Sequence, residues 1–216
     1  MDKDEFRRKL IDSKQRWAAE GRLLTGTVAK RGRDRLPPGQ HVVKNWPVLD
    51  LGVQPKVEPW EWNLTIDGLV GKAVTWTLQD FLAQPQVQST SDIHCVTAWS
   101  RYDNRWEGVA AKHVLAVVAP LPKARHLVCH SHDGYTTNLK LSDFDDDDAL
   151  LAYKWDGQKL PREHGGPVRA VVPKLYFWKS AKWLKRIEFV AGDKPGFWEE
   201  RGYHNDGDPW QEQRYG

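Results

Sequence analysis

Cysteine, methionine and long apolar stretches are scarce in this chain of 216 residues, which has two cysteines and one methionine. Two cysteines cannot form the disulfide framework of a small secreted protein, and a chain of this length can bury roughly 70% of its unfolded surface without one. No apolar run approaches the roughly 20 residues of a membrane-spanning helix. The N-terminal residues Met1 to Arg8 also lack the apolar segment of a signal peptide. We therefore expect a cytoplasmic protein with no membrane segment.

Several common catalytic motifs are missing as well. The chain contains no G-x-S-x-G nucleophile elbow, no Walker or Rossmann phosphate loop, and neither C-x-x-C nor H-E-x-x-H spacing. A zinc site could still use His126, His130 and His132, which fall close together with Cys129. In a strand, however, Cys129 would face away from these histidines, so zinc is the minor alternative.

Positive charge is concentrated near the N-terminus. Residues 1–40 contain 11 Lys and Arg against 6 Asp and Glu, although the whole chain carries a net charge of only +3. Residues 4–20 predict an amphipathic helix that Gly21 ends, and residues 25–39 are rich in Gly, Arg and Pro, as an extended arm would be. We expect residues 1–35 to form this basic helix and arm, and residues 36–216 to form one domain. A basic leader could bind nucleic acid, but a solvated helix is the simpler interpretation.

The rest of the chain favours β-structure, with few helices. Residues 60–68 alternate and end in Asp67-Gly68, which predicts a half-buried strand and a hairpin to residues 74–77, followed by a short capped helix at 77–82. An apolar helix, or a helix plus a strand, is predicted at 109–119. Further strands are predicted at 41–45, 127–130, 150–157, 168–173 and 183–190. The 12 tryptophans are too many for an average core and suggest flat rings that line a pocket.

The stretch His94-Cys95-Val96-Thr97-Ala98-Trp99-Ser100 is the first candidate for chemistry. It is short and β-prone, and we expect the polar residues 88–92 before it to form a turn. A buried cysteine in β-structure is usually an inert apolar group. A thiolate that binds a metal or acts as a nucleophile needs positive charge or a metal beside it.

The chain supplies positive charge further on. Arg169 lies within an apolar strand, Lys182 directly precedes another, and His164 stands before the Gly165-Gly166 turn. An arginine among apolar residues requires a buried partner, and such cations can hold a phosphate. A soft thiolate together with cations fits a phosphorylated metal cofactor.

Five stretches, in order and with similar spacing, resemble the molybdenum-cofactor domain of the sulfite oxidase family. They cover most of the chain from about Leu36 onward, and the resemblance is greatest to small, stand-alone prokaryotic members. The stretches are Val43-Lys44-Asn45-Trp46-Pro47-Val48, residues 94–100, residues 131–138 (Ser-His-Asp-Gly-Tyr-Thr-Thr-Asn), residues 164–169 (His-Gly-Gly-Pro-Val-Arg) and residues 179–184 (Lys-Ser-Ala-Lys-Trp-Leu).

The resemblance implies a single-domain α+β fold of the sulfite oxidase type, rich in β-sheet, that binds molybdopterin and molybdenum. It implies that Cys95 is the protein's thiolate ligand to the metal. The positions that it implies for cofactor binding are Lys44, Asn45, Trp46, Cys95, Asp133, His164, Arg169, Ser180, Ala181 and Lys182.

The residues after Cys95 differ from those of true sulfite oxidases, which have a small residue, Gly, Asn and two arginines there. Val96 to Ser100 instead resemble the bacterial methionine-sulfoxide reductase branch, and Lys44 stands where an arginine is expected. We expect an enzyme that moves an oxygen atom to or from a small sulfur- or nitrogen-containing substrate. Arg101 and Tyr102 are predicted to contact that substrate, and electrons are expected from an external redox protein. The alternative is a non-catalytic module of the same fold that binds the cofactor or a nucleic acid.

Overall fold

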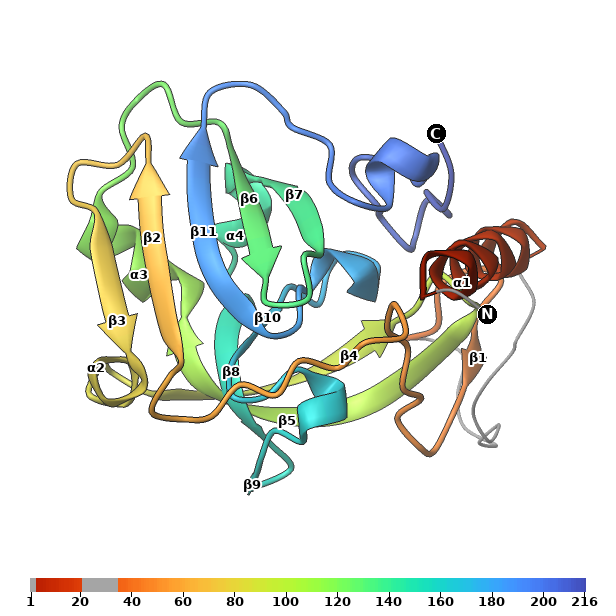
Figure 1. The fold of residues 1–216 in the computed structure, drawn as a ribbon, viewed down its shortest axis with the longest axis horizontal. Coiled ribbons are helices and arrows are strands. Elements are labelled where there is room, and N and C mark those ends of the chain that lie inside the picture. The colour runs from red at the N-terminus through yellow and green to blue at the C-terminus, as the bar shows by residue number, and fades with distance from the viewer. Residues whose placement is uncertain (1–2, 21–34) are drawn as a thin grey trace.

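The computed structural model describes residues 3–20 and 35–216 (Figure 1). The predicted arm up to residue 34 and the helix stop at Gly21 lie outside the described residues. The α-helices of the described part are α1 (Lys3–Ala19), α2 (Leu78–Leu82), α3 (Ala111–Val118) and α4 (Leu141–Phe144). Short 3-10 turns cover Arg162–His164, Phe177–Lys179 and Glu199–Arg201.

One sheet is organised around a long strand, β5 (Trp99–Ala110). On β5, the strands β4 (Val87–His94) and β8 (Leu150–Trp155) pair antiparallel, and β1 (His41–Val42) pairs parallel. The strands β9 (Gln158–Lys159) and β10 (Arg169–Val171) then pair with β8. The hairpin turn between β4 and β5 therefore projects from one end of this sheet, and Cys95 lies in that turn.

The second sheet has the order β3-β2-β11-β6-β7. These strands are β2 (Asn63–Gly68), β3 (Val74–Thr77), β6 (His126–Ser131), β7 (Thr136–Lys140) and β11 (Leu184–Val190). The central strand β11 pairs parallel with β2 and antiparallel with β6. Ile187 and Phe189 of β11 are buried while Glu188 between them is only partly buried, as the alternation of its sequence predicts. Leu184 is buried as well, and the pairing with β6 shifts register between Leu184 and Arg186.

A single hydrophobic core contains side chains from both sheets, among them Leu64, Trp106, Leu151 and Phe189. The expected α+β class, rich in β-sheet and built as one domain, is therefore confirmed. The hairpin β2–β3 is confirmed too. The predicted cap of α2 is present, because Thr77 Oγ1 accepts from the Asp80 backbone N–H at 3.2 Å.

The prediction of a turn at residues 88–92 is wrong, because these residues belong to β4. Their polarity has a physical reason: among the residues that the structure describes, β4 pairs only with β5 and forms an edge of the sheet, and its side chains are mostly exposed up to Thr90. The turn itself comes later, where Ala98 N–H donates to the Cys95 carbonyl at 3.1 Å. Cys95 is thus held in a tight turn rather than within a strand.

The termini meet on one side of the molecule. In Figure 1, α1 lies beside the C-terminal segment and near the Cys95 end of the β4–β5 hairpin. Gln15 Nε2 of α1 donates to the carbonyl of Arg201 at 2.6 Å, and Ala18 is fully buried. Segments from both ends of the chain therefore come together near the Cys95 end of the β4–β5 hairpin.

Candidate active site

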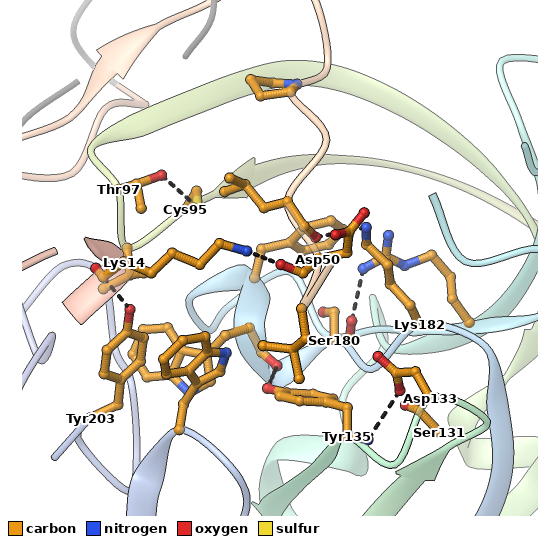
Figure 2. A pocket seen from close by; sticks show the side chains of 18 of the residues that line it. Lys14, Asp50, Cys95, Thr97, Ser131, Asp133, Tyr135, Ser180, Lys182 and Tyr203 are labelled. Atoms are coloured by element: carbon orange, nitrogen blue, oxygen red, sulfur yellow. Dashed lines mark hydrogen bonds between the residues drawn. The ribbon is translucent and has the colours of Figure 1, made fainter. Parts of the chain in front are cut away.

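A pocket with an empty volume of about 800 Å³, part of it open to solvent, lies where α1, the Cys95 turn, β10 and the C-terminal segment come together (Figure 2). Its lining combines aromatic rings with a few charged groups. The lining residues discussed below are Lys14, Trp46, Asp50, Cys95, Thr97, Trp99, Ser131, Asp133, Tyr135, Arg169, Trp178, Ser180, Lys182, Trp198 and Tyr203.

Cys95 lies on the wall of this pocket with its thiol 3.2 Å from Thr97 Oγ1. The residue is only 7% exposed, and it forms no disulfide. Burial raises the pKa of the Cys95 thiol, an effect that the hydrogen bond to Thr97 and the charges of Arg214 and Lys14 oppose. A thiolate at this position therefore requires a further positive centre, and a bound metal ion is such a centre.

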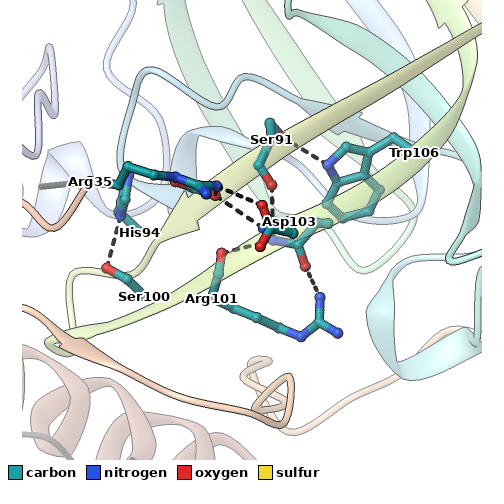
Figure 3. Close-up of polar contacts among 9 residues, drawn as sticks. Arg35, Ser91, His94, Ser100, Arg101, Asp103 and Trp106 are labelled. Atoms are coloured by element: carbon teal, nitrogen blue, oxygen red, sulfur yellow. Dashed lines mark hydrogen bonds and ion pairs between the residues drawn. The ribbon is translucent and has the colours of Figure 1, made fainter. Parts of the chain in front are cut away.

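The turn that carries Cys95 is fixed by a buried hydrogen-bond network on the neighbouring strand ends (Figure 3). His94 Nδ1 lies 2.8 Å from Ser100 Oγ, which donates to Gln40 Oε1 at 3.1 Å. Gln40 Nε2 in turn donates to the Cys95 carbonyl at 3.0 Å. Burial lowers the pKa of His94 to about 4, so this ring is neutral at physiological pH. His94 and Ser100 thus position the cysteine turn and are not part of the lining.

Two buried cations, Arg169 and Lys182, line another part of the pocket. Arg169 is 1% exposed and, within the described part of the chain, donates only to backbone carbonyls, those of His164 at 2.8 Å, Ser180 at 2.7 Å and Ala170 at 3.2 Å. Burial lowers the pKa of Arg169 to about 9.

Lys182 Nζ likewise donates to two carbonyls, those of Leu49 at 2.8 Å and Glu163 at 2.6 Å. Burial, together with the charge of Arg169, lowers the pKa of Lys182 to about 7. Within residues 3–20 and 35–216, neither Lys182 nor Arg169 forms an ion pair. Buried cations without a paired anion are costly, so this part of the pocket is suited to a bound anion such as a phosphate.

The pocket also has buried polar atoms that lack hydrogen-bond partners among the described residues. Trp99 Nε1 and Ser131 Oγ are buried at the pocket and have no hydrogen-bond partner within the described residues. Buried donors without partners are rare in folded proteins, and a bound group can satisfy them. A soft thiol, two unpaired cations and open donors are the donor set that a molybdenum-binding pterin with a phosphate requires. The residues present therefore fit molybdopterin.

Six of the residues predicted to bind the cofactor line this pocket: Trp46, Cys95, Asp133, Arg169, Ser180 and Lys182. His164 lies directly behind Trp46, with ring centroids 3.7 Å apart and planes within 6° of parallel. Its carbonyl holds Arg169, so it supports the lining from behind. Ala181 is fully buried and its carbonyl accepts from the Ala170 backbone N–H at 2.9 Å.

Lys44, Asn45, Arg101 and Tyr102 do not belong to the pocket lining. Lys44 and Asn45 are exposed. Arg101, seen in Figure 3, bonds Asn104 Oδ1. It also lies 3.3 Å from Asp156 Oδ2 and stacks over the Trp155 ring. The Tyr102 ring lies 4.7 Å from the Arg35 guanidinium carbon. The predicted contacts of Arg101 and Tyr102 with substrate therefore find no support in the pocket's geometry.

The residues predicted for the site do not include Lys14, Asp50 or Tyr203, all of which line the pocket. Lys14 had a recognisable signal, because it lies on the apolar stripe of α1 between Ile11 and Trp17. Asp50 and Tyr203 lie in segments without a periodic pattern, so only the fold brings them to the site.

The zinc alternative receives no support. Within the described residues, no group of at least three His, Cys, Asp or Glu side chains is arranged to hold a metal ion. His130 instead lies 3.4 Å from Glu188 Oε2, and Cys129 is fully buried on β6.

None of the helices in the described ranges is long and apolar enough to span a membrane.

Comparison with known proteins places this site in a family. Residues 51–198 match the model of the oxidoreductase molybdopterin binding domain. The chain is 47% identical over 182 residues to the uncharacterized oxidoreductase YuiH of Bacillus subtilis, which covers 84% of this chain and 92% of that protein. It is 30% identical over 162 residues to the protein-methionine-sulfoxide reductase catalytic subunit MsrP of Pseudomonas syringae, covering 67% of this chain and 47% of that one.

Two further relatives agree. A putative protein-methionine-sulfoxide reductase subunit, YedZ1 of Azospira oryzae, is 29% identical over 150 residues, which are 69% of this chain and 56% of that protein. The chain thus spans only about half the length of these reductase relatives. The fold matches the sulfane dehydrogenase SoxCD of Paracoccus pantotrophus with a TM-score of 0.59 at 22% identity, over 64% of this chain and 40% of that one. The chain therefore belongs to the oxidoreductase molybdopterin binding domain family, and it is a molybdopterin-dependent oxidoreductase of the sulfite oxidase type whose cofactor contains molybdenum.

Proposed function

We propose that this enzyme transfers an oxygen atom to or from a small sulfur- or nitrogen-containing substrate, with sulfur the favoured atom. The names of the relatives support sulfur, because they include methionine-sulfoxide reductases and a sulfane dehydrogenase. For a sulfoxide, the balanced reaction consumes two electrons and two protons and yields a thioether and water. The reverse direction oxidises the sulfur with an oxygen atom from water and releases the same electrons and protons.

The single observation that carries this proposal is the Cys95 thiol on the wall of a pocket that also holds the unpaired cations Arg169 and Lys182. Bound molybdopterin supplies the two-electron exchange of an oxygen atom at its molybdenum. Cys95 would hold the metal through its sulfur, and burial of the thiol makes that interaction strong. Arg169 and Lys182 would hold the phosphate.

The aromatic wall would orient the substrate and exclude water. Trp178 and Trp198 both pack against Tyr203, with ring centroids 5.0 Å and 4.9 Å away. Tyr135 donates its hydroxyl to the Trp178 carbonyl at 2.6 Å, which fixes this wall against β7. Rigid aromatic surfaces suit a thioether or sulfoxide, because sulfur makes favourable contacts with rings.

An external electron-transfer protein would supply or remove the two electrons. Each oxygen transfer leaves the cofactor changed by two electrons, and the substrate cannot restore it. The names of the reductase relatives describe subunits, which is consistent with a separate partner for those proteins. For this chain, the partner and the predicted cytoplasmic location are parts of the proposal.

The first experiment measures metal and pterin in protein purified from a host that makes the cofactor. We expect about one molybdenum and one pterin per chain in the wild type. Cys95→Ser should retain pterin but lose the protein thiolate from the metal, which X-ray absorption would detect. The matched control is Cys129→Ser, whose thiol lies in the core away from the pocket. Wild-type protein without molybdenum, or unchanged ligation in Cys95→Ser, would contradict the proposal.

The second experiment sets the direction and substrate. Oxidation of a reduced viologen dye in the presence of methionine sulfoxide would show reduction, and reduction of an acceptor dye by sulfite would show oxidation. In either assay, Cys95→Ser should slow turnover about 100-fold or more, since even residues that only support a metal ligand cost 10- to 100-fold. Activity in neither assay would require a nitrogen substrate such as an N-oxide to be tested next.

A further inference from the structure

Helix α1 lies outside the part of the chain that matches the family model, residues 51–198. Even so, it packs on the pocket. Tyr203 donates its hydroxyl to the Lys14 carbonyl at 3.4 Å, and Tyr215 donates to the Gln15 carbonyl. Phe6 and Leu10 of α1 approach Gly52 so closely that an added Cβ would meet Leu10 Cδ1 at 2.9 Å. The helix is thus held by the C-terminal segment and by the loop that contains Asp50.

Lys14 of α1 is a charged residue that is buried, at 8% exposure, and it lines the pocket. Its ammonium group donates to the backbone carbonyl of Asp50. An ammonium group has three N–H donors, and a neutral carbonyl does not balance its charge. The Asp50 carboxylate, which also accepts from Gln54 Nε2 and from the Gly52 N–H, each at 2.8 Å, attracts the Lys14 ammonium group and balances part of its charge. Among the described residues Lys14 Nζ donates one hydrogen bond, to the Asp50 carbonyl, so it retains N–H donors for an anion in the pocket.

The position of Lys14 differs from that of the other pocket cations. Figure 2 shows Lys14 entering the pocket on the side of Cys95 and Thr97, whereas Lys182 and Asp133 lie on the opposite side. Lys14 and Cys95 are near enough to influence each other electrostatically. Arg169 and Lys182 thus serve one region of the pocket, and Lys14 serves the region next to the thiol.

The charges of the lining also leave a surplus. Three cations, Lys14, Arg169 and Lys182, face two carboxylates, Asp50 and Asp133. A pocket with this composition favours anions in more than one region.

We propose that α1 is part of the active site and that Lys14 binds a small sulfur oxyanion beside Cys95, as a specificity-determining residue for the substrate. This inference rests on the proposed function and names the substrate class of the same site. It assigns to Lys14 the electrostatic role for which sequence reasoning had suggested Arg101. The shared chemistry is a negatively charged oxygen group, which either the substrate or the cofactor could provide, and the test separates these two sources.

The test titrates inorganic sulfate into molybdenum-loaded wild-type, Lys14→Met and Lys14→Gln proteins by calorimetry. We expect each neutral variant to bind sulfate about 10-fold or more weakly, because a charge-assisted hydrogen bond is lost. Lys14→Arg should recover most of the affinity, since it restores the charge. The matched control is Lys9→Met, which removes a lysine with a side chain 64% exposed on the same helix.

Molybdenum and pterin contents of the same samples separate the two sources of the anion. Unchanged contents with weakened sulfate binding support the substrate assignment. Loss of pterin from Lys14→Gln, with sulfate binding unchanged in the fraction that stays loaded, overturns it in favour of a cofactor contact. Equal sulfate affinity in all variants, or no sulfate binding by the wild type, also overturns it. Lys14→Gln retains a donor for the Asp50 carbonyl, so it serves if Lys14→Met does not fold. Failure of the proposed function would show separately, as wild-type protein without molybdenum.

Discussion

At the scale of single residues, the pocket concentrates buried positive charge, and this charge has a cost in the cofactor-free protein. Lys182 illustrates it: burial is the largest cause that lowers its pKa from 10.5 to about 7. The unfolded chain keeps this proton up to about pH 10.5, whereas the folded protein releases it above about pH 7. Between these values the unfolded state binds more protons, so stability rises with pH. Phosphate binding would remove the penalty by pairing the charge.

Lys182→Met should therefore change how stability depends on pH. The variant, compared with the wild type, should gain on the order of a few kcal/mol of unfolding free energy at or below pH 7, and lose this advantage as the pH approaches 10. Urea unfolding of cofactor-free protein at several pH values measures it. Lys185→Met, at an exposed position on the neighbouring strand, is the control and should follow the wild type. A constant difference between Lys182→Met and wild type across this range would contradict the charge argument.

A site residue could be predicted from the sequence where its chemical character differs from that of its neighbours along the chain. Arg169 was predictable because a guanidinium among apolar residues has to find a buried environment, and the structure buries it. Lys14 was not predicted, although it stands on the apolar stripe of a helix. The charged side chains of a basic helix usually face solvent, and this was the simpler expectation. Arg101 was selected for its nearness to Cys95 in sequence, yet β5 carries it away from the pocket and toward Asp156. Nearness along a strand does not imply a shared face.

At the scale of elements, one buried ion pair holds the C-terminal segment against the second sheet. Lys179 Nζ lies 2.7 Å from Glu199 Oε1, and both side chains are fully buried. The same carboxylate oxygen accepts from Thr137 Oγ1 and from Trp178 Nε1, each at 2.9 Å. The pair therefore connects β7 and the Phe177–Lys179 turn to the Glu199–Arg201 turn, and it positions the Trp178 ring of the pocket.

Glu199→Gln should destabilise the protein by about 3–5 kcal/mol, because it leaves the buried Lys179 ammonium unpaired. The double variant Lys179→Met with Glu199→Leu should recover much of this loss, since it removes both charges. Chemical denaturation of the three proteins measures these differences. The surface pair Arg186–Asp67, at 2.9 Å, provides a comparison. Asp67→Asn should cost no more than about 1 kcal/mol. Equal costs at the two sites would show that burial of the ion pair does not govern its contribution.

The elements that were predicted correctly have a periodic pattern, and the others lack one for physical reasons. The strands β2 and β11 pair side by side and alternate between core and solvent, so their sequences show it. The edge strand β4 is polar because one of its edges has no partner strand. The C-terminal segment packs through rings such as Trp198 on Tyr203, and such contacts need no regular spacing. The sulfite oxidase-type fold was accessible only through the resemblance of several short motifs taken together.

At the scale of the whole molecule, the pocket is built from segments that are far apart in sequence. Lys14 comes from the N-terminal helix, Cys95 from the β4–β5 hairpin, Arg169 from β10 and Tyr203 from the C-terminal segment. The two sheets form a common core that provides the rigid support. The two terminal segments complete one side of the pocket, where α1 contributes Lys14 to the same lining as Cys95.

Removal of residues 1–34 should therefore expose the Cys95 end of the pocket while the two sheets remain folded. The helix contributes few residues to the core, chiefly Ala18 and part of Ile11, so loss of α1 removes little of the buried surface. In cofactor-free protein, iodoacetamide should modify Cys95 faster in the truncated chain than in the full chain, because exposure controls thiol reactivity. Mass spectrometry of the two cysteine peptides over time measures both rates.

Cys129 is the internal control for this truncation. It lies fully buried on β6, and burial raises its pKa to about 12, so it should stay unmodified in both proteins as long as the sheets are intact. Faster modification of both cysteines would mean that the truncated chain unfolds and that α1 is needed for the fold. Unchanged modification of Cys95 would mean that the loop around Asp50 or the C-terminal segment shields the thiol without α1. Selective modification of Cys95 would establish α1 as the cover of the metal-binding end of the pocket, which is the position that Lys14 needs in order to meet a substrate there.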